Sequence, residues 1–327
     1  MPTSRREFLR AMLAGAGYIF LGLPGCSRRK AFPSEKKGGG IPSETVDGDN
    51  VIAVASGRDP AANVDASVSA VGGFGRFVRK NDVVLVKPNI AWNRPVRYGA
   101  NTDPNVVRAV IKGCLEAGAK EVRVCDRTCE DPRSTYRRSG IADAAREAGA
   151  KVYYVEEEYL YRETPIPEGK VLKSWPFLID ALEADVFINV PAAKHHDAAG
   201  LTLSIKNLMG ILGGNRGEIH AGIHEKLVDL YTAFRPALNI LDATRCLVRY
   251  GPQGSGPEDV VEVGKVIAGV NALTVDAYGA QTLPFQKLDD LPGYIRNGGA
   301  RGLGEIEISR MNVQEVDTAK TVVAFSG

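Results

Sequence analysis

The stretch Val83-Val84-Leu85-Val86-Lys87-Pro88-Asn89 decides the fold class of this chain. Its four apolar residues do not alternate with polar ones, which is typical of a strand buried on both faces of a parallel sheet. A helix is predicted next, over residues 104–117, because Asp103 caps a first turn that contains Pro104 and Gly118 follows the last helical residue. Val122-Arg123-Val124-Cys125 then predicts a second strand, so strand, helix and strand follow one another.

Strand-like runs and amphipathic stretches alternate along the rest of the chain. Further strands are predicted at residues 152–155, 186–190, 238–241 and 266–270, and further helices at 139–148, 200–212 and 220–234. Strands rich in Val and Ile and separated by helices indicate an α/β fold, with a mainly parallel sheet covered by helices on both faces. We expect residues 51–327 to form a single α/β body.

The first 26 residues predict an export signal. Ser4-Arg5-Arg6-Glu7-Phe8-Leu9-Arg10 has the paired arginines, the Phe-Leu and the further basic residue of a twin-arginine signal. Residues 11–23 are mostly apolar and too short to span a bilayer, which takes about 20 residues. Both faces of this run are apolar, which argues against an amphipathic helix. We therefore expect the twin-arginine translocase to export the chain in a folded state.

A lipid anchor is predicted at Cys26, because Leu23-Pro24-Gly25-Cys26 resembles a lipoprotein cleavage box. Pro24 stands where such a box usually has a small residue, so ordinary cleavage with a soluble product remains the alternative. More than one acyl chain on Cys26 would give stable anchoring. Residues 27–50 are polar and glycine-rich, which predicts a flexible tether. The expected location is the periplasm or cell envelope, at a membrane.

The charge balance argues against a nucleic-acid partner. The chain holds 41 basic and 39 acidic residues, and residues 1–26 contain three arginines and one glutamate, so the remainder carries 38 of each sign. A body without net charge has no overall positive field to attract nucleic acid.

Cysteines are too few for a disulfide scaffold, and none forms a Cys-x-x-Cys motif. Cys125 and Cys129 stand beside a predicted turn and leave two alternatives open, a disulfide or a weak metal site. No cysteine run of the ferredoxin type is present, so no iron–sulfur cluster is expected.

Polar residues follow several of the predicted strands. Ligands of parallel sheets bind beyond the carboxyl ends of the strands. The segments at those ends are Lys87-Pro88-Asn89, Asp126-Arg127-Thr128, Pro191-Ala192-Ala193-Lys194-His195-His196 and Asp242-Ala243-Thr244. Most of these segments are polar and charged, which indicates a site at this edge of the sheet.

Four cations are expected to converge at that site. Lys87, Lys194 and Lys206 lie at or near strand ends, and Arg216 lies in the glycine-rich stretch 213–217. Converging cations on a neutral body predict a pocket for a small anion, such as a carboxylate or phosphate. A partly desolvated lysine also serves enzymes as a base or as a Schiff-base former. For one lysine alone a solvated position is the simpler interpretation; the convergence of three favours a site.

The histidines suggest a metal ion. His220 and His224 are four residues apart, so on a helix they would share a face and reach one ion. His196, just beyond the strand at 186–190, would supply a third ligand, and a neighbouring carboxylate a fourth. This hypothesis predicts a divalent or transition metal at His196, His220 and His224, although the pair lacks the glutamate of a His-Glu-x-x-His motif.

A series of short motifs gives the chain a resemblance to a known family. The motifs are Val84-Leu85-Val86-Lys87-Pro88-Asn89, Thr102-Asp103-Pro104, Asn189-Val190-Pro191-x-x-Lys194-x-His196 and Thr202-Leu203-x-x-Lys206-Asn207-x-x-Gly210, with His220, Asp229, Pro236-Ala237-Leu238, Asp242, Gly251-Pro252 and Asp276 downstream. Over about residues 51–285 they resemble the bacterial and archaeal domain-of-unknown-function family three-six-two. The family has no established common activity, and this sequence lacks the ferredoxin-like modules of some members. A more distant similarity, to lactate racemases with a nickel cofactor, is tied to no single motif.

The resulting hypothesis is an exported enzyme that acts on a small anionic ligand. Its centre would comprise Lys194, His196, Lys206 and Asn207, and Lys194 or His196 would transfer the proton. Ligand binding is predicted to involve Lys87, Asn89 and Arg216. The alternative is a non-catalytic binding or assembly lipoprotein of the cell envelope.

Overall fold

A computed structural model of the chain describes residues 50–285 and 290–321. The expected export signal, the lipidation site Cys26 and residues 27–49 of the expected tether lie outside the described residues. Within the two described ranges, no helix is both long enough and apolar enough to cross a membrane.

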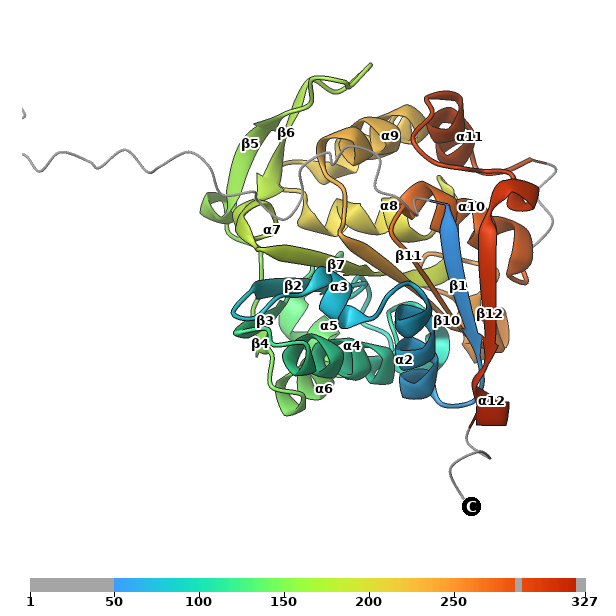
Figure 1. The fold of residues 1–327 in the computed structure, drawn as a ribbon. Helices are drawn as coiled ribbons and strands as arrows, with labels where there is room; N and C mark the ends of the chain where they lie inside the picture. The colour runs from blue at the N-terminus through green and yellow to red at the C-terminus, as the bar shows by residue number, and fades with distance from the viewer. Residues whose placement is uncertain (1–49, 286–289, 322–327) are drawn as a thin grey trace, which may run out of the picture. The chain divides into compact units, whose positions relative to one another are not determined.

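A central sheet organises the described residues (Figure 1), and its main strands follow the order β12-β1-β11-β10-β7-β2-β3-β4. β11 is antiparallel to both of its neighbours, and the other adjacent pairs in this order are parallel. The strands are β1 Val51–Ser56, β2 Val83–Pro88, β3 Glu121–Val124, β4 Lys151–Val152, β7 Val186–Val190, β8 Ala192–His196, β9 Gly200–Thr202, β10 Leu238–Leu247, β11 Val260–Gly269 and β12 Asn312–Asp317. The predicted α/β class with a mainly parallel sheet is confirmed.

Helices cover both faces of this sheet. α2, α4 and α6 lie on one side of it, and α8, α9 and α10 lie on the other (Figure 1). The helices are α2 Pro60–Ala70, α3 Phe74–Phe77, α4 Pro104–Glu116, α5 Pro132–Arg138, α6 Ile141–Glu147, α7 Ile179–Glu183, α8 Ser204–Asn207, α9 Ile223–Ala233, α10 Ala272–Thr282, α11 Gly293–Ala300 and α12 Thr318–Thr321. A separate antiparallel hairpin is formed by β5 Tyr161–Pro165 and β6 Ser174–Leu178.

The unbroken apolar run of β2 reflects this double coverage. Leu85 packs into the cluster beneath α8, α9 and α10, while Val84 and Val86 pack into the cluster that contains α4. Successive side chains of a strand point to opposite faces, so a strand covered on both sides is apolar at every position. Asp103 begins α4 as predicted, because its carboxylate accepts the N–H of Asn105 at 2.8 Å.

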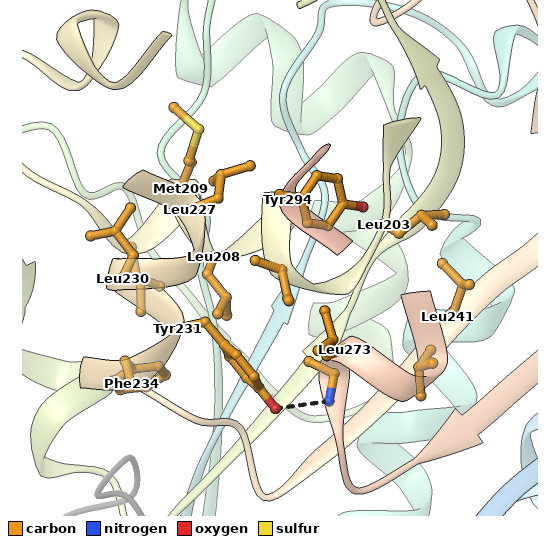
Figure 2. Packing of buried hydrophobic residues seen from close by; sticks show 14 of the residues in the cluster. Leu203, Leu208, Met209, Leu227, Leu230, Tyr231, Phe234, Leu241, Leu273 and Tyr294 are labelled. Carbon is orange, nitrogen blue, oxygen red and sulfur yellow. Dashed lines mark hydrogen bonds between the residues drawn. The ribbon is translucent and has the colours of Figure 1, made fainter. Parts of the chain in front are cut away.

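The short helix α8 is held by apolar residues on either side of it. Figure 2 shows Leu203 and Leu208, which flank α8, in the buried cluster that also contains Leu227, Leu273 and Tyr294. Close packing of this kind restricts how far a short helix can shift. The polar residues that α8 carries are therefore held in position relative to the sheet.

Two of the predicted helices begin three or four residues later in the structure than expected. Residues 200–202 form β9, which pairs antiparallel with β8, and only then does α8 begin. Gly200 has a left-handed φ of 78° that turns the chain back along β8. α9 begins at Ile223, not near residue 220, because Gly222 is left-handed and Arg216–His220 forms a separate 3₁₀ turn, η4. Periodicity within the segment does not reveal a pairing with another strand.

Candidate functional site

A cavity of about 340 Å³ lies at the carboxyl ends of β2, β3 and β7. β2 lies between the other two strands, so the chain leaves β2 toward β3 on one side and later returns to β7 on the other. Ligands of open α/β sheets bind at such a reversal of strand order. Eight of the predicted site residues line the cavity, namely Lys87, Asn89, Lys194, His196, Lys206, Asn207, Arg216 and His220.

A buried ion pair forms the floor of this site. Lys87, at the end of β2, places its Nζ 2.8 Å from Oδ1 of Asp126, and both side chains are almost fully buried. The other oxygen of Asp126 accepts the N–H of Ile90 at 2.6 Å. Burial lowers the pKa of Lys87, and the attraction of Asp126 opposes that shift. The pair therefore has two opposite charges that compensate each other within the core.

Gly210 closes over this ion pair. A Cβ atom at Gly210 would lie 1.7 Å from Oδ1 of Asp126 and 2.7 Å from Nζ of Lys87. Any side chain there would displace the pair, which explains why a glycine stands in the turn after α8.

Two asparagines connect the strands around the cavity. Oδ1 of Asn207 accepts from Lys87 Nζ at 3.0 Å and from Asn89 Nδ2 at 2.9 Å. Nδ2 of Asn207 donates to Oδ1 of Asn189 on β7 at 2.9 Å. These bonds tie α8 to both β2 and β7. Asn89 and Asn207 are therefore positioning residues for the neighbouring lysines.

Lys194 on β8 is buried, and its partners are neutral. Its Nζ donates to Oδ1 of Asn89 at 3.0 Å and to the carbonyl of Ala100 at 2.5 Å. Burial and the charges of Lys206 and Lys87 together lower its pKa to about 7, although Cys129 and Asp126 act in the opposite direction. Lys194 therefore exchanges its proton near neutral pH.

Lys206 on α8 differs from the other two lysines. The residue is only 9% exposed and lines the cavity, and its ammonium makes no hydrogen bond or ion pair with any residue in 50–285 or 290–321. Burial lowers its pKa to about 8, and the charges of Arg216 and Lys87 add to that shift, while Cys129 opposes it. A buried cation without a protein partner is costly, so this ammonium is the group in the site most in need of an anion.

The hydrogen bonds of His196 and His220 give the two rings opposite roles. Their centroids lie 5.9 Å apart with the rings nearly parallel. Nδ1 of His196 accepts the backbone N–H groups of Ala198 and Ala199 at 3.2 and 3.3 Å, so the proton of the neutral ring is on Nε2. Nδ1 of His220 lies 3.2 Å from the carbonyl of Gly217 and donates to it, so its Nε2 has the lone pair.

His196 stays neutral over the physiological range. Burial lowers its pKa to about 3, and the charges of Lys206 and Lys194 contribute to that shift. Its Nε2–H is therefore a hydrogen-bond donor without charge, while Nε2 of His220 is an acceptor.

Arg216 fixes the glycine-rich stretch to the loop that follows β3. Its guanidinium donates to the carbonyls of Arg127, at 2.5 Å, and Thr128, and one of its nitrogens lies 3.5 Å from Sγ of Cys129. Arg216 thus contributes positive charge to the cavity wall while its N–H groups bind backbone carbonyls. Cys125 is buried and Cys129 is exposed, and both are free thiols in the structure, so they form no disulfide.

Comparison with known proteins places these residues within one family. Residues 84–281 match the family described as Domain of unknown function (DUF362). This chain belongs to the DUF362 family. The DUF362 match includes every residue that lines the cavity.

The chain is also similar to a known protein and to a solved structure. The chain is 28% identical over 225 residues to the thylakoid-associated protein sll1697 of Synechocystis, which covers 66% of this chain and 67% of that protein. Among solved structures, the lactate racemase apoprotein from Thermoanaerobacterium thermosaccharolyticum is similar with a TM-score of 0.38 and 12% identity. That similarity covers 71% of this chain and 59%, less than two thirds, of the racemase.

The third histidine of the metal hypothesis lies apart from the other two. Left-handed Gly222 separates His220 from α9, so the helix face that His220 and His224 were expected to share is not formed, and that expectation was wrong. His224 packs instead against Gly293 of α11, where a Cβ atom would lie 2.8 Å from the imidazole. The described residues contain no group of three His, Cys, Asp or Glu side chains suited to a metal. Metal binding by this DUF362 protein stays a prediction.

Asp126, Cys129 and Thr202 are among the other residues that line the cavity. Asp126 lies just beyond β3, and its segment was among the strand ends at which the sequence predicted a site. The hydroxyl of Thr202 is buried, and it has no hydrogen-bond partner among the described parts of the chain. Thr202 was missed because its segment was expected to be helical. In the structure it lies on β9, opposite Lys194 of β8.

Proposed function

We propose that this DUF362 protein is an enzyme that binds a small anion, a carboxylate or phosphate, in the cavity and transfers protons to and from it. The observation that carries the proposal is the buried ammonium of Lys206, which faces the cavity without a protein partner. An anion there would supply the missing charge, and the hydroxyl of Thr202 and Nε2–H of His196 are further donors in the same wall.

Proton transfer is supported by the acid–base properties of the cavity. Lys194 and Lys206 have pKa values lowered to about 7 and about 8, near the pH at which most enzymes work. General acids and bases are most effective when their pKa lies near the working pH. His220, which has its Nε2 lone pair on the same cavity, adds a neutral base.

Replacing Lys206 with methionine is expected to weaken anion binding about 10–100-fold, the equivalent of one charge-assisted hydrogen bond of about 1.5–3 kcal/mol. Calorimetric titration with inorganic phosphate, propanoate and pyruvate measures the affinities. The matched control is Lys112→Met, because Lys112 is an exposed lysine of α4 that does not line the cavity. Equal affinities in the wild type and Lys206→Met would contradict the proposal, and so would binding of none of the three anions.

A second candidate is a non-catalytic binding or assembly lipoprotein at a membrane. It is favoured by the Synechocystis relative, which is described as thylakoid-associated. The two candidates differ in turnover: an enzyme converts a bound anion, whereas a binding protein releases it unchanged. Hydrogen–deuterium exchange into bound pyruvate or propanoate, followed by NMR, separates them.

We also propose that residues 1–26 direct twin-arginine export and that Cys26 is lipidated. The double variant Arg5→Lys/Arg6→Lys is expected to leave the precursor in the cytoplasm of a two-membrane bacterium, because the pathway recognises paired arginines. Cys26→Ala is expected to move the protein from the membrane fraction to the soluble fraction.

Fractionation and mass spectrometry of the mature N-terminus measure both export effects. The chain supplies its own control in Arg28-Arg29, a second adjacent pair just after the cleavage box. Arg28→Lys/Arg29→Lys should be exported as the wild type is. Normal export of Arg5→Lys/Arg6→Lys would rule out the twin-arginine route for this chain.

A further inference from the structure

The three cavity lysines differ in what their nitrogen atoms contact. Lys87 is bound to Asp126, Asn207 and a carbonyl, and Lys194 is bound to Asn89 and a carbonyl. Lys206 has no such partner in either described range, although the residue is nine-tenths buried. Its nitrogen is therefore the one among the three that can approach a ligand without breaking an existing bond.

The surroundings of Lys206 favour a neutral amine. Burial removes water from Lys206, and the guanidinium of Arg216 and the ammonium of Lys87 repel its positive charge, so its pKa falls to about 8 although Cys129 acts in the opposite direction. Met209 and Ala198 contribute apolar surface to the same cavity. Desolvation and neighbouring cations are the conditions under which lysines act as nucleophiles toward carbonyl groups.

We propose that Lys206 forms a covalent imine with the carbonyl carbon of a small 2-oxo acid bound in the cavity. This inference rests on the proposed function, because the carboxylate of the 2-oxo acid is the bound anion. The remaining donors of the wall, Nε2–H of His196 and the hydroxyl of Thr202, would hold the carboxylate once Lys206 has reacted.

The chemical step balances without a further reactant. The ammonium of Lys206 first gives a proton to Nε2 of His220, which lines the same cavity. The amine then attacks the carbonyl carbon, the carbonyl electron pair moves to oxygen, and the oxygen takes a proton from the attacking nitrogen. Loss of that oxygen as water, with the proton returned by His220, leaves a protonated C=N bond. Overall, one ammonium and one ketone give one iminium and one water, and no electrons are gained or lost.

Reductive trapping tests the imine directly. The full chain is incubated with pyruvate and sodium borohydride, and its mass and tryptic peptides are then measured. The expected result is a single adduct at Lys206, about tenfold less adduct when excess propanoate competes, and none when propanoate replaces pyruvate, since propanoate has no ketone. Lys206→Arg keeps the positive charge but cannot form an imine, so it is expected to abolish the adduct, whereas Lys112→Arg is expected to retain it.

The outcomes distinguish the proposed imine from the proposed anion site on which it depends. If pyruvate and propanoate bind in calorimetry but borohydride traps nothing at Lys206, the imine is overturned and the anion site stands. If neither acid binds, both proposals fail. Trapping spread over exposed lysines, and unaffected by Lys206→Arg, also overturns the imine. Peptide mapping of the wild type locates the adduct even if the arginine variant does not fold.

Discussion

Replacing Asp126 with asparagine is expected to lower the free energy of unfolding by about 3–5 kcal/mol, the usual cost of leaving one partner of a buried ion pair uncompensated. Asparagine keeps the shape of the side chain and an oxygen for the N–H of Ile90, but it removes the charge that lies 2.8 Å from Lys87 Nζ. Lys87 is fully buried, so it would then have to lose its proton or remain charged without a partner. Urea unfolding followed by circular dichroism measures the change.

A surface ion pair of the same length provides the matched control. Arg108 and Glu147 also lie 2.8 Å apart, but their side chains are 33% and 66% exposed. Glu147→Gln is expected to cost less than about 1 kcal/mol. The double variant Lys87→Met/Asp126→Asn should be more stable than Asp126→Asn alone, because it removes the unpaired charge. A loss below about 1 kcal/mol for Asp126→Asn would show that the buried pair does not stabilise the fold.

Strand ends made much of the candidate site predictable from the sequence. Lys87 and Asn89 end one buried apolar run, and Lys194 and His196 follow another. Once both runs are strands of one parallel sheet, their carboxyl ends lie at the same edge, and the structure brings these four side chains to one cavity. The convergence therefore follows from the two strand assignments alone.

The contacts between segments were not predictable in the same way. That Lys87 pairs with Asp126 depends on the register between β2 and β3, and no local pattern contains that register. The β8–β9 hairpin follows from the left-handed turn at Gly200, while the apolar spacing of residues 200–212 matches a helix equally well. The separation of His220 and His224 has the same origin. It follows from a left-handed glycine at position 222, which helical periodicity does not reveal.

Raising the pH from 7.5 to 8.5 is expected to weaken anion binding and to stabilise the fold at the same time. Lys194 and Lys206 have folded-state pKa values of about 7 and about 8, below the ordinary lysine value of 10.5. In this window the unfolded chain therefore binds more protons than the folded one, and stability rises with pH. The expected gain is about 1–2 kcal/mol over the unit. Urea unfolding at several pH values measures it.

Other buried groups set the limits of that window. Burial raises the pKa of Asp276 to about 7. Asp276 therefore makes stability fall as the pH rises, opposite to the effect of the lysines, but mainly below pH 7. Burial also raises the pKa values of the thiols of Cys114, Cys125 and Cys246. Near pH 9 the unfolded chain loses its thiol protons while the folded chain keeps them, so these thiols oppose the effect of the lysines on stability there. Between these limits the two lysines dominate the slope of the free energy of unfolding against pH. Lys206→Met should make this slope smaller.

The anion affinity changes in the opposite direction, because an ammonium that has lost its proton no longer attracts an anion. Over the same pH unit the affinity should fall about threefold if only Lys206 must be protonated, and more than about tenfold if Lys194 must be protonated as well. Calorimetry with inorganic phosphate or propanoate in two buffers of different ionisation enthalpy gives both the affinity and the protons taken up. An affinity that stays constant from pH 7.5 to 8.5, with no proton uptake, would mean that neither lysine contacts the anion. A fall in the free energy of unfolding over the same range would mean that the folded state stabilises the two ammonium groups, so that their pKa values are not lowered.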